Sequence, residues 1–121
     1  MLLVLVEIRS RVGPLKELTE ALPDIVAKGL TVPGTDCELL PHHVGVVFNE
    51  TTGNLDQNIP DVLILVWAQT DPELLEELDV RRHAIAKEIS LHIPDYGMEV
   101  RIGLVPTSYE RMEASPVPGS C

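Results

Sequence analysis

The 121-residue sequence is poor in aromatic residues, in cysteine and in positive charge. Aromatic side chains make up 3% of the chain, so its core has to be built from Leu, Val and Ile, within an apolar content of 45%. The two cysteines, Cys37 and Cys121, give no disulfide framework, and a reduced cytoplasmic protein is the simple interpretation. We therefore expect one globular domain that folds by burying aliphatic side chains.

Basic residues are outnumbered by acidic ones, 9 to 19, which gives a formal net charge of −10. Because phosphate recognition needs a basic face, this charge excludes nucleic acid as a partner, and it disfavours an anionic membrane surface. The N-terminal run Met1–Val6 lacks a basic region, and Glu7 and Arg9 interrupt it too early for a signal sequence. No run approaches the ~20 apolar residues that a membrane helix needs. We expect no membrane partner.

Motifs for metals, phosphates and nucleophiles are absent from the sequence. It contains no HExxH, CxxC or glycine-rich phosphate loop. His42 and His43 adjoin a predicted strand and would point to opposite faces, while His83 and His92 are nine positions apart on a predicted helix. We therefore expect no metal and no cofactor. The His42–His43 pair is interpreted as surface or structural, with a general acid or base as the alternative.

The clearest fold signal runs from Val62 to Val105. An apolar run, Val62–Ala68, predicts a buried strand, and Met98–Val105 predicts a second one. Between them, the sequence Thr70-Asp71-Pro72-Glu73 has the form of a capping box that opens a helix, and Pro94 ends it. Apolar residues at helical spacing give this helix one buried face: Leu75, Leu78, Ile85 and Ile89.

The first half of the chain predicts the same three elements. Residues 2–9 form a strand, and a helix opened by Pro14 carries one apolar face and stops near Gly29. Pro23 lies inside that helix and is expected to kink or divide it. A loop from Thr31 to Pro41 precedes a strand at Val44–Asn49 and a long polar loop at Glu50–Asp61. The apolar positions of the helix are Leu15, Leu18, Leu22, Ile25 and Val26.

The two halves match at an offset of 60 residues. Leu5 falls on Leu65, and Val44 falls on Leu104. We therefore predict an α/β (α+β) protein with two βαβ units in the order β-α-β-β-α-β. They form a single domain over residues 1–105, followed by a C-terminal tail over residues 106–121. A ferredoxin-like fold, with four antiparallel strands and both helices on one face, has the same element order and is the alternative.

The pattern resembles the tautomerase superfamily, which includes macrophage migration inhibitory factor and carboxymethyl-hydroxymuconate isomerase. The resemblance rests on the strand at the very N-terminus, on Arg9-Ser10-Arg11 at its end, on the paired units, and on Val100–Leu104 leading into Pro106–Tyr109. It covers residues 2 to about 110. It implies that each unit keeps its two strands parallel, that a pseudo-twofold axis joins the units, and that other subunits cover the open face of the sheet.

That open face is expected to be strongly apolar. It would carry Leu3, Leu5, Leu63, Leu65 and Trp67, a large patch for a monomer to expose. We therefore expect a homo-oligomer, with a trimer favoured by the resemblance. Glu7, Glu99 and Arg101 fall on the same face, and we interpret Glu7 with Arg101 as a structural pair in the oligomer interface, with polar groups of a site as the alternative.

The resemblance implies a site at the start of the first strand. The family uses an N-terminal proline, whose amine moves a proton between carbon and oxygen. Here Leu2 occupies that position, and a bulky second residue should leave Met1 in place, so the Met1 α-amine is the candidate base. The candidates for binding a substrate carboxylate are three arginines: Arg9, Arg11 and Arg101.

Two functions remain open from the sequence. The first is a keto–enol tautomerase or isomerase, acting on small anionic keto acids without the catalytic N-terminal proline. The second is a non-enzymatic oligomeric α/β protein that binds a small ligand or a protein partner. Leu2 favours the second as far as activity is concerned.

Overall fold

A computed structural model describes residues 2–9, 12, 15–31, 39–51, 60–69 and 76–105. The predicted capping box at residues 70–73, most of the polar loop, and the tail at 106–121 lie outside these residues. The described elements, in chain order, are β1 (Leu2–Arg9), α1 (Lys16–Leu30), the 3-10 helix η1 (Pro41–His43), β2 (Val44–Thr51), β3 (Val62–Gln69), α3 (Leu78–His92) and β4 (Met98–Val105).

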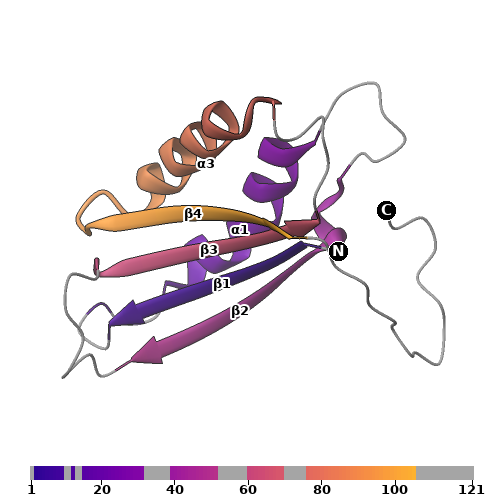
Figure 1. Ribbon diagram of the computed structural model, residues 1–121. Coiled ribbons are helices and arrows are strands. Elements are labelled where there is room, and N and C mark those ends of the chain that lie inside the picture. Colours follow the sequence, from indigo (N-terminus) through magenta and orange to yellow (C-terminus); the bar gives the residue numbers. More distant parts are fainter. Residues whose placement is uncertain are drawn as a thin grey trace, which may run out of the picture.

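The four strands form one mixed sheet in the order β2-β1-β3-β4 (Figure 1). β1 is parallel to β2, β3 is parallel to β4, and the two central strands, β1 and β3, are antiparallel. The prediction of two βαβ units is confirmed. The ferredoxin-like alternative is wrong, because its strands would all be antiparallel.

The pairing of β1 with β3 places a pseudo-twofold axis at the centre of the sheet. Leu5 lies opposite Leu65, and these two residues are also the ones that the 60-residue offset equates. The outer strands follow a different offset, because Leu2 pairs with Val44 whereas Val62 pairs with Met98. The match of Val44 with Leu104 is therefore wrong: the connection from β3 to β4 is six residues shorter than that from β1 to β2 (98 − 62 = 36 against 44 − 2 = 42).

The core between the sheet and the helices is aliphatic, as the shortage of aromatic residues predicted. Every second residue of β1 and β3 points into it, in keeping with the two-residue period of a strand. The most fully buried side chains are all Leu, Ile or Val. They are Val4, Val6, Ile8, Leu18, Leu22, Val26, Leu30, Val62, Ile64, Val66, Ile85 and Ile89.

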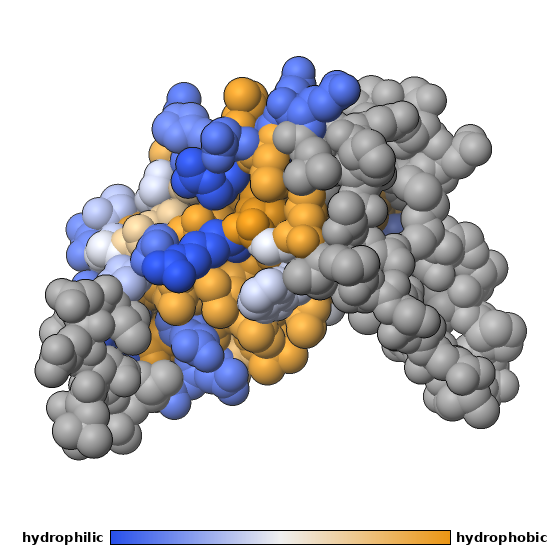
Figure 2. All heavy atoms as spheres, viewed as in Figure 1, coloured by the Kyte–Doolittle hydropathy of each residue, from blue (hydrophilic) through white to orange (hydrophobic). Residues whose placement is uncertain are grey.

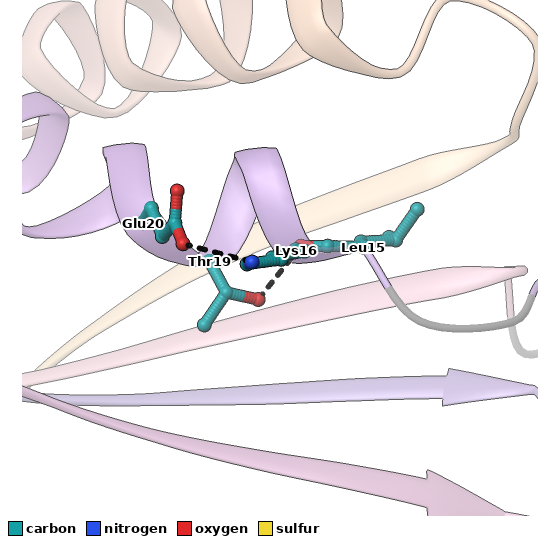
Figure 3. A network of polar contacts seen from close by, with 4 residues as sticks. All are labelled: Leu15, Lys16, Thr19 and Glu20. Atoms are coloured by element: carbon teal, nitrogen blue, oxygen red, sulfur yellow. Dashed lines mark hydrogen bonds and ion pairs between the residues drawn. The ribbon is translucent and has the colours of Figure 1, made fainter.

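Helix α1 continues without a break through Pro23. In its first turn the Thr19 hydroxyl donates to the Leu15 carbonyl at 2.8 Å, and Lys16 Nζ lies 4.0 Å from Glu20 Oε1 on the surface (Figure 3). Pro23 has no N–H to donate to the Thr19 carbonyl, one turn earlier. Of the two predicted outcomes, a kink or a division, the division does not occur. Buried residues on both sides of Pro23 anchor the helix to the sheet: Leu18, Leu22, Val26 and Leu30.

The ends of the other elements differ little from the prediction. β2 extends to Thr51, two residues beyond the predicted Asn49, because it pairs with β1 along its whole length. α3 ends at His92, just before Ile93 and Pro94. Among the described residues, no helix is long and apolar enough to cross a membrane.

The two helices approach closely where α1 ends. A Cβ placed on Gly29 would overlap Ile85 Cγ1 and would lie 2.8 Å from Ile85 Cδ1, so only glycine permits this contact. Beside it, Arg81 Nη1 of α3 donates to the carbonyls of Gly29 at 3.2 Å and Thr31 at 2.8 Å. Arg81 therefore binds carbonyls at the C-terminal end of α1 that have no intrahelical partner.

Replacement of Gly29 by Ala is expected to lower the free energy of unfolding. Alanine favours a helix by about 1 kcal/mol over glycine, but overpacking against the buried Ile85 costs about 1–3 kcal/mol. We expect a net loss of about 1 kcal/mol, measured by urea unfolding.

Gly97→Ala is the matched control, since a Cβ at Gly97 would meet nothing within 4 Å. Its stability should stay within about 0.5 kcal/mol of the wild type. A Gly29→Ala variant as stable as the wild type would contradict the close contact with Ile85.

Candidate functional site

The sheet face opposite the helices is apolar and uncovered in the single chain. Its central rows pair Leu3 with Trp67, Leu5 with Leu65, and Glu7 with Leu63. Trp67 is 41% exposed and Leu3 39% exposed, and Figure 2 shows hydrophobic residues gathered over this face. The structure thus places all five predicted apolar residues on one surface, the kind of patch that marks an interaction site.

Trp67 lies over the edge strand β4 on this face. A Cβ on Gly103, its neighbour across the ladder, would meet Trp67 Cζ3 at 2.5 Å and Cε3 at 2.7 Å. The glycine therefore makes room for the indole ring. Beside the ring, a hollow of about 350 Å³ is lined by Leu65, Trp67, Arg101 and Gly103, among other residues.

Arg101 is the cation of this hollow. Its Nε donates to Glu99 Oε1 at 2.8 Å, and Glu99 is its partner among the described residues. The predicted interface pair of Glu7 with Arg101 stays a prediction: β3 separates β1 from β4 in one subunit, so the pair would have to form between subunits. The terminal nitrogens of Arg101 have no partner among the described residues, and two parallel N–H groups bind a carboxylate well.

The N-terminal end of β1 is the second part of the candidate site. Leu2 is 5% exposed, faces the helices and pairs with Val44. The residue that stands where the family has its proline is therefore a core residue, and its side chain is not available for chemistry. Met1, the candidate base, lies outside the described residues.

Arg9 lies at the other end of β1. The strand rises roughly 3.3 Å per residue, so about 23 Å separate Leu2 from Arg9. One subunit therefore cannot bring Arg9 to the amino group that precedes Leu2, and only a neighbouring subunit could do so. Arg11 lies outside the described residues.

His42 and His43 are in η1, a 3-10 turn that directly precedes β2, so they adjoin the strand as predicted. Their ring centroids are 4.2 Å apart, because successive residues of a tight turn do not alternate between two faces. His42 is exposed, whereas His43 is 7% exposed and is the single buried polar side chain among the described residues. Its Nδ1 accepts a hydrogen bond from the Leu40 N–H at 3.1 Å.

Burial lowers the pKa of His43 below its ordinary value of 6.5, and the charges of His42 and of the N-terminal amino group lower it further. His43 is therefore a neutral imidazole at neutral pH. Sequence reasoning noted the pair but did not separate the buried ring from the exposed one. Pro41, which begins the 3-10 turn, was the sequence feature that could have indicated a turn at this point.

No metal centre forms among the residues that the structure describes, since no three His, Cys, Asp or Glu side chains gather there. The chemistry available in these parts of the chain is that of an arginine and a neutral imidazole.

Solved structures similar to this chain in fold include members of the tautomerase superfamily. RhCC from Rhodococcus jostii RHA1 is 14% identical and has a TM-score of 0.62, with 98% of this chain and 89% of that chain covered. A member of the cis-3-chloroacrylic acid dehalogenase family is 16% identical, with a TM-score of 0.59 and coverages of 97% and 85%. A fused 4-OT described as a wild-type symmetric trimer is 17% identical, with a TM-score of 0.56 and coverages of 86% and 85%.

No family model and no curated protein matches the sequence. At identities of 14–17% the likeness to the solved structures concerns the fold alone. The chain has the tautomerase-superfamily fold, and the resemblance inferred from the sequence is confirmed at that level.

The lowered pKa of His43 predicts how stability depends on pH. Below about pH 6.5 the unfolded chain takes up a proton at His43 that the folded chain resists, so the folded state is destabilised as the pH falls. The free energy of unfolding should therefore be smaller at about pH 5.5 than at about pH 7.5. In His43→Asn this difference should shrink, as measured by urea unfolding at both pH values.

The matched control is His42→Asn, which removes an exposed imidazole from the same turn. It should leave more of the pH dependence in place than His43→Asn does. Equal pH dependence in the wild type and His43→Asn would show that His43 titrates alike in the folded and unfolded chains.

Proposed function

We propose that this protein is a homotrimer that catalyses keto–enol tautomerisation of small anionic keto acids, with proton transfer at the N-terminal end of β1. The observation that carries the proposal is the mixed sheet, whose central strand begins at Leu2. It supports the proposal because Leu2, which follows the proposed base, begins a strand at the centre of the sheet. The cytoplasmic location inferred from the low cysteine content is part of the same proposal.

In this proposal the Met1 α-amine takes the proton from the substrate carbon and returns it to oxygen. The pKa of an α-amine lies close enough to neutrality for this role. Leu2 provides no secondary amine, so the base is weaker than the proline amine of the family. Arg101 binds the substrate carboxylate. This assignment is supported because Arg101 lines the Trp67 hollow and its terminal nitrogens have no partner among the described residues.

Arg9 and Arg11 enter the site from a neighbouring subunit. The length of β1 supports this assignment, because Arg9 lies at the far end of the sheet from Leu2. A substrate held between subunits would then require the assembly, so activity and oligomerisation would be lost together.

The trimer is proposed to form through the open sheet face. Its support is the apolar character of that face and the trimeric state of the fused 4-OT structure. Removing apolar surface from water is worth roughly 25 cal/mol per Å², so covering several Leu side chains and Trp67 would favour association.

Leu65→Arg is expected to abolish assembly. It places a charge at the centre of the open face, where a covering subunit would have to desolvate it. Light scattering should give the mass of three chains for the wild type and of one chain for the variant. The emission of Trp67, the single tryptophan, should shift to longer wavelength in the variant as the ring becomes wetter.

Val80→Arg is the matched control, since Val80 is an exposed apolar residue on α3, in the opposite layer of the molecule. It should leave the mass unchanged. A wild-type protein with the mass of one chain would refute the trimer.

Leu2→Pro is expected to create or strengthen tautomerase activity toward phenylpyruvate. Removal of Met1 then exposes a secondary amine, and a well-placed base is worth about 100-fold or more in rate. Because Leu2 is buried, the variant should also lose about 2 kcal/mol of stability. Arg101→Gln in either background should lower kcat/KM by about tenfold or more, through loss of a charged hydrogen bond.

Arg82→Gln is the control for Arg101→Gln. Arg82 is an exposed arginine of α3 that is also next to a carboxylate, with its Nη2 3.5 Å from Asp79 Oδ1. Its activity should equal that of the parent. Phenylpyruvate turnover by neither the wild type nor Leu2→Pro would rule out the enzymatic proposal.

The second candidate is a non-enzymatic oligomer that binds a small ligand or a protein partner. The burial of Leu2 in the core favours it, since this side chain serves the fold. The phenylpyruvate assay separates the two candidates. If the wild-type trimer is inactive and only Leu2→Pro is active, the fold lacks its catalytic amine and the second candidate is supported.

A further inference from the structure

We propose that His43 is the hydrogen-bond donor of the site at the N-terminal end of β1, and that its Nε2–H binds the keto oxygen of a 2-keto carboxylate. This inference rests on the proposed function, which supplies the base and the arginine but no group for the reacting oxygen. Four observations lead to it: the position of His43, its burial, its hydrogen bond and its charge.

The register of the sheet fixes the position of His43. Val44 pairs with Leu2 in the parallel ladder, so His43, which directly precedes β2, lies at the end of the sheet where β1 begins. The positive charge of the N-terminal amino group acts on His43, in keeping with this position. His43 therefore adjoins the end of β1 at which the proposed base would act.

The fold does not require a histidine at this point. Under the pseudo-twofold axis, β2 corresponds to β4 and Val44 to Met98, so the counterpart of His43 is Gly97. The second half thus begins its outer strand with no side chain where the first half buries an imidazole. The architecture therefore does not require an imidazole at this position. A role in the site at the N-terminal end of β1 accounts for its presence in the first half.

The hydrogen bond from Leu40 sets the tautomer. Because Nδ1 accepts the Leu40 N–H, the proton of the neutral ring is on Nε2. Among the described residues, Arg81 Nε is the single side-chain nitrogen or oxygen that is both buried and without a partner. Nε2 of His43 also has no partner among the described residues. Because it is not one of the buried atoms without a partner, it must be accessible at the surface.

The charge of the ring suits a donor to a developing oxyanion. The lowered pKa keeps His43 neutral at neutral pH, so the ring adds no positive charge beside the amine and does not compete with it for a proton. A neutral imidazole can polarise a carbonyl when its other nitrogen is fixed by a backbone group. Preorganised donors of this kind act most strongly on charge that appears in the transition state.

The step balances with the groups already named. The free N-terminal amine removes the proton from the carbon next to the keto group, the C–H electron pair forms the C=C bond, and the C=O pair moves to oxygen. The Nε2–H of His43 stabilises that enolate oxygen without losing its proton. The ammonium then gives its proton to the oxygen, and the amine is regenerated.

The test uses the full-length protein and benzoylformate, a 2-keto carboxylate with no enolisable carbon, so binding is measured without turnover. In the wild type, benzoylformate should shift the His43 Nε2 signal in ¹H–¹⁵N spectra of the imidazole rings. His43→Asn keeps an acceptor for the Leu40 N–H but lacks the Nε2 donor, and its Kd should rise about 3- to 10-fold. His43→Gln places an amide N–H near the Nε2 position and should keep most of the affinity.

His42→Asn is the control in the same turn and should bind as the wild type does. An unchanged Kd in His43→Asn, an equal loss in His43→Asn and His43→Gln, or a His43 signal that benzoylformate does not move would each overturn the assignment. The wild-type spectra decide the question even where a variant folds poorly.

Turnover of phenylpyruvate separates this inference from the proposed function. If both hold, His43→Asn should lower kcat by about 100-fold, the cost of removing one oxyanion donor. If His43→Asn has the same kcat as the wild type, the proposed role of His43 is overturned and the tautomerase proposal stands. Benzoylformate binding at His43 without any turnover overturns the tautomerase and leaves the binding role standing.

Discussion

The antiparallel pairing of β1 with β3 is the constraint on which the rest of the structure depends. Each βαβ half has only two strands, and two strands with one helix cannot enclose a core. By pairing Leu5 with Leu65 at the centre, the chain joins the halves into one four-stranded sheet and sets both helices side by side on one face. The aliphatic core, the helix contact and the open face all follow from this pairing.

The open face follows because the two helices cover only one side of the sheet. Strand alternation then sends Val4, Val6 and their counterparts on β3 into the core, while Leu3 and Leu5 emerge on the other side. A sheet that is apolar on both faces suits a structure in which both faces are covered. The sequence of the strands is thus more readily understood for an assembly than for a single chain.

Strand positions and fold class were predictable because the strands are short apolar runs bounded by turn residues. The mixed sheet followed from the paired units together with the family resemblance, since the element order alone also allows the ferredoxin-like arrangement. The 60-residue offset located β3 correctly from β1 but not β4 from β2, because apolar strands match at several registers. The helix is not divided at Pro23, because the helix-breaking tendency of one proline is outweighed by the burial of the helix on either side of it.

The candidate site was less predictable. Arg101 was identified on the correct face, but its contact with Glu99, two residues away on the same strand, was not predicted. The separation of Leu2 from Arg9 follows from strand geometry once β1 is known to span both residues. The distinct environments of His42 and His43 could not be derived, because they depend on a 3-10 turn whose burial is set by tertiary contacts.

The bond between Arg81 and the end of α1 has a consequence for how the molecule is assembled. Arg81 belongs to the second half, while Gly29 and Thr31 belong to the first. The halves are therefore joined in both layers, through backbone pairing in the sheet and through side chains between the helices. In this sense the protein resembles an intramolecular heterodimer of two βαβ units with complementary surfaces. Residues 2–51 and 60–105, made as separate fragments, carry between them every contact that joins the two halves in the described part of the chain.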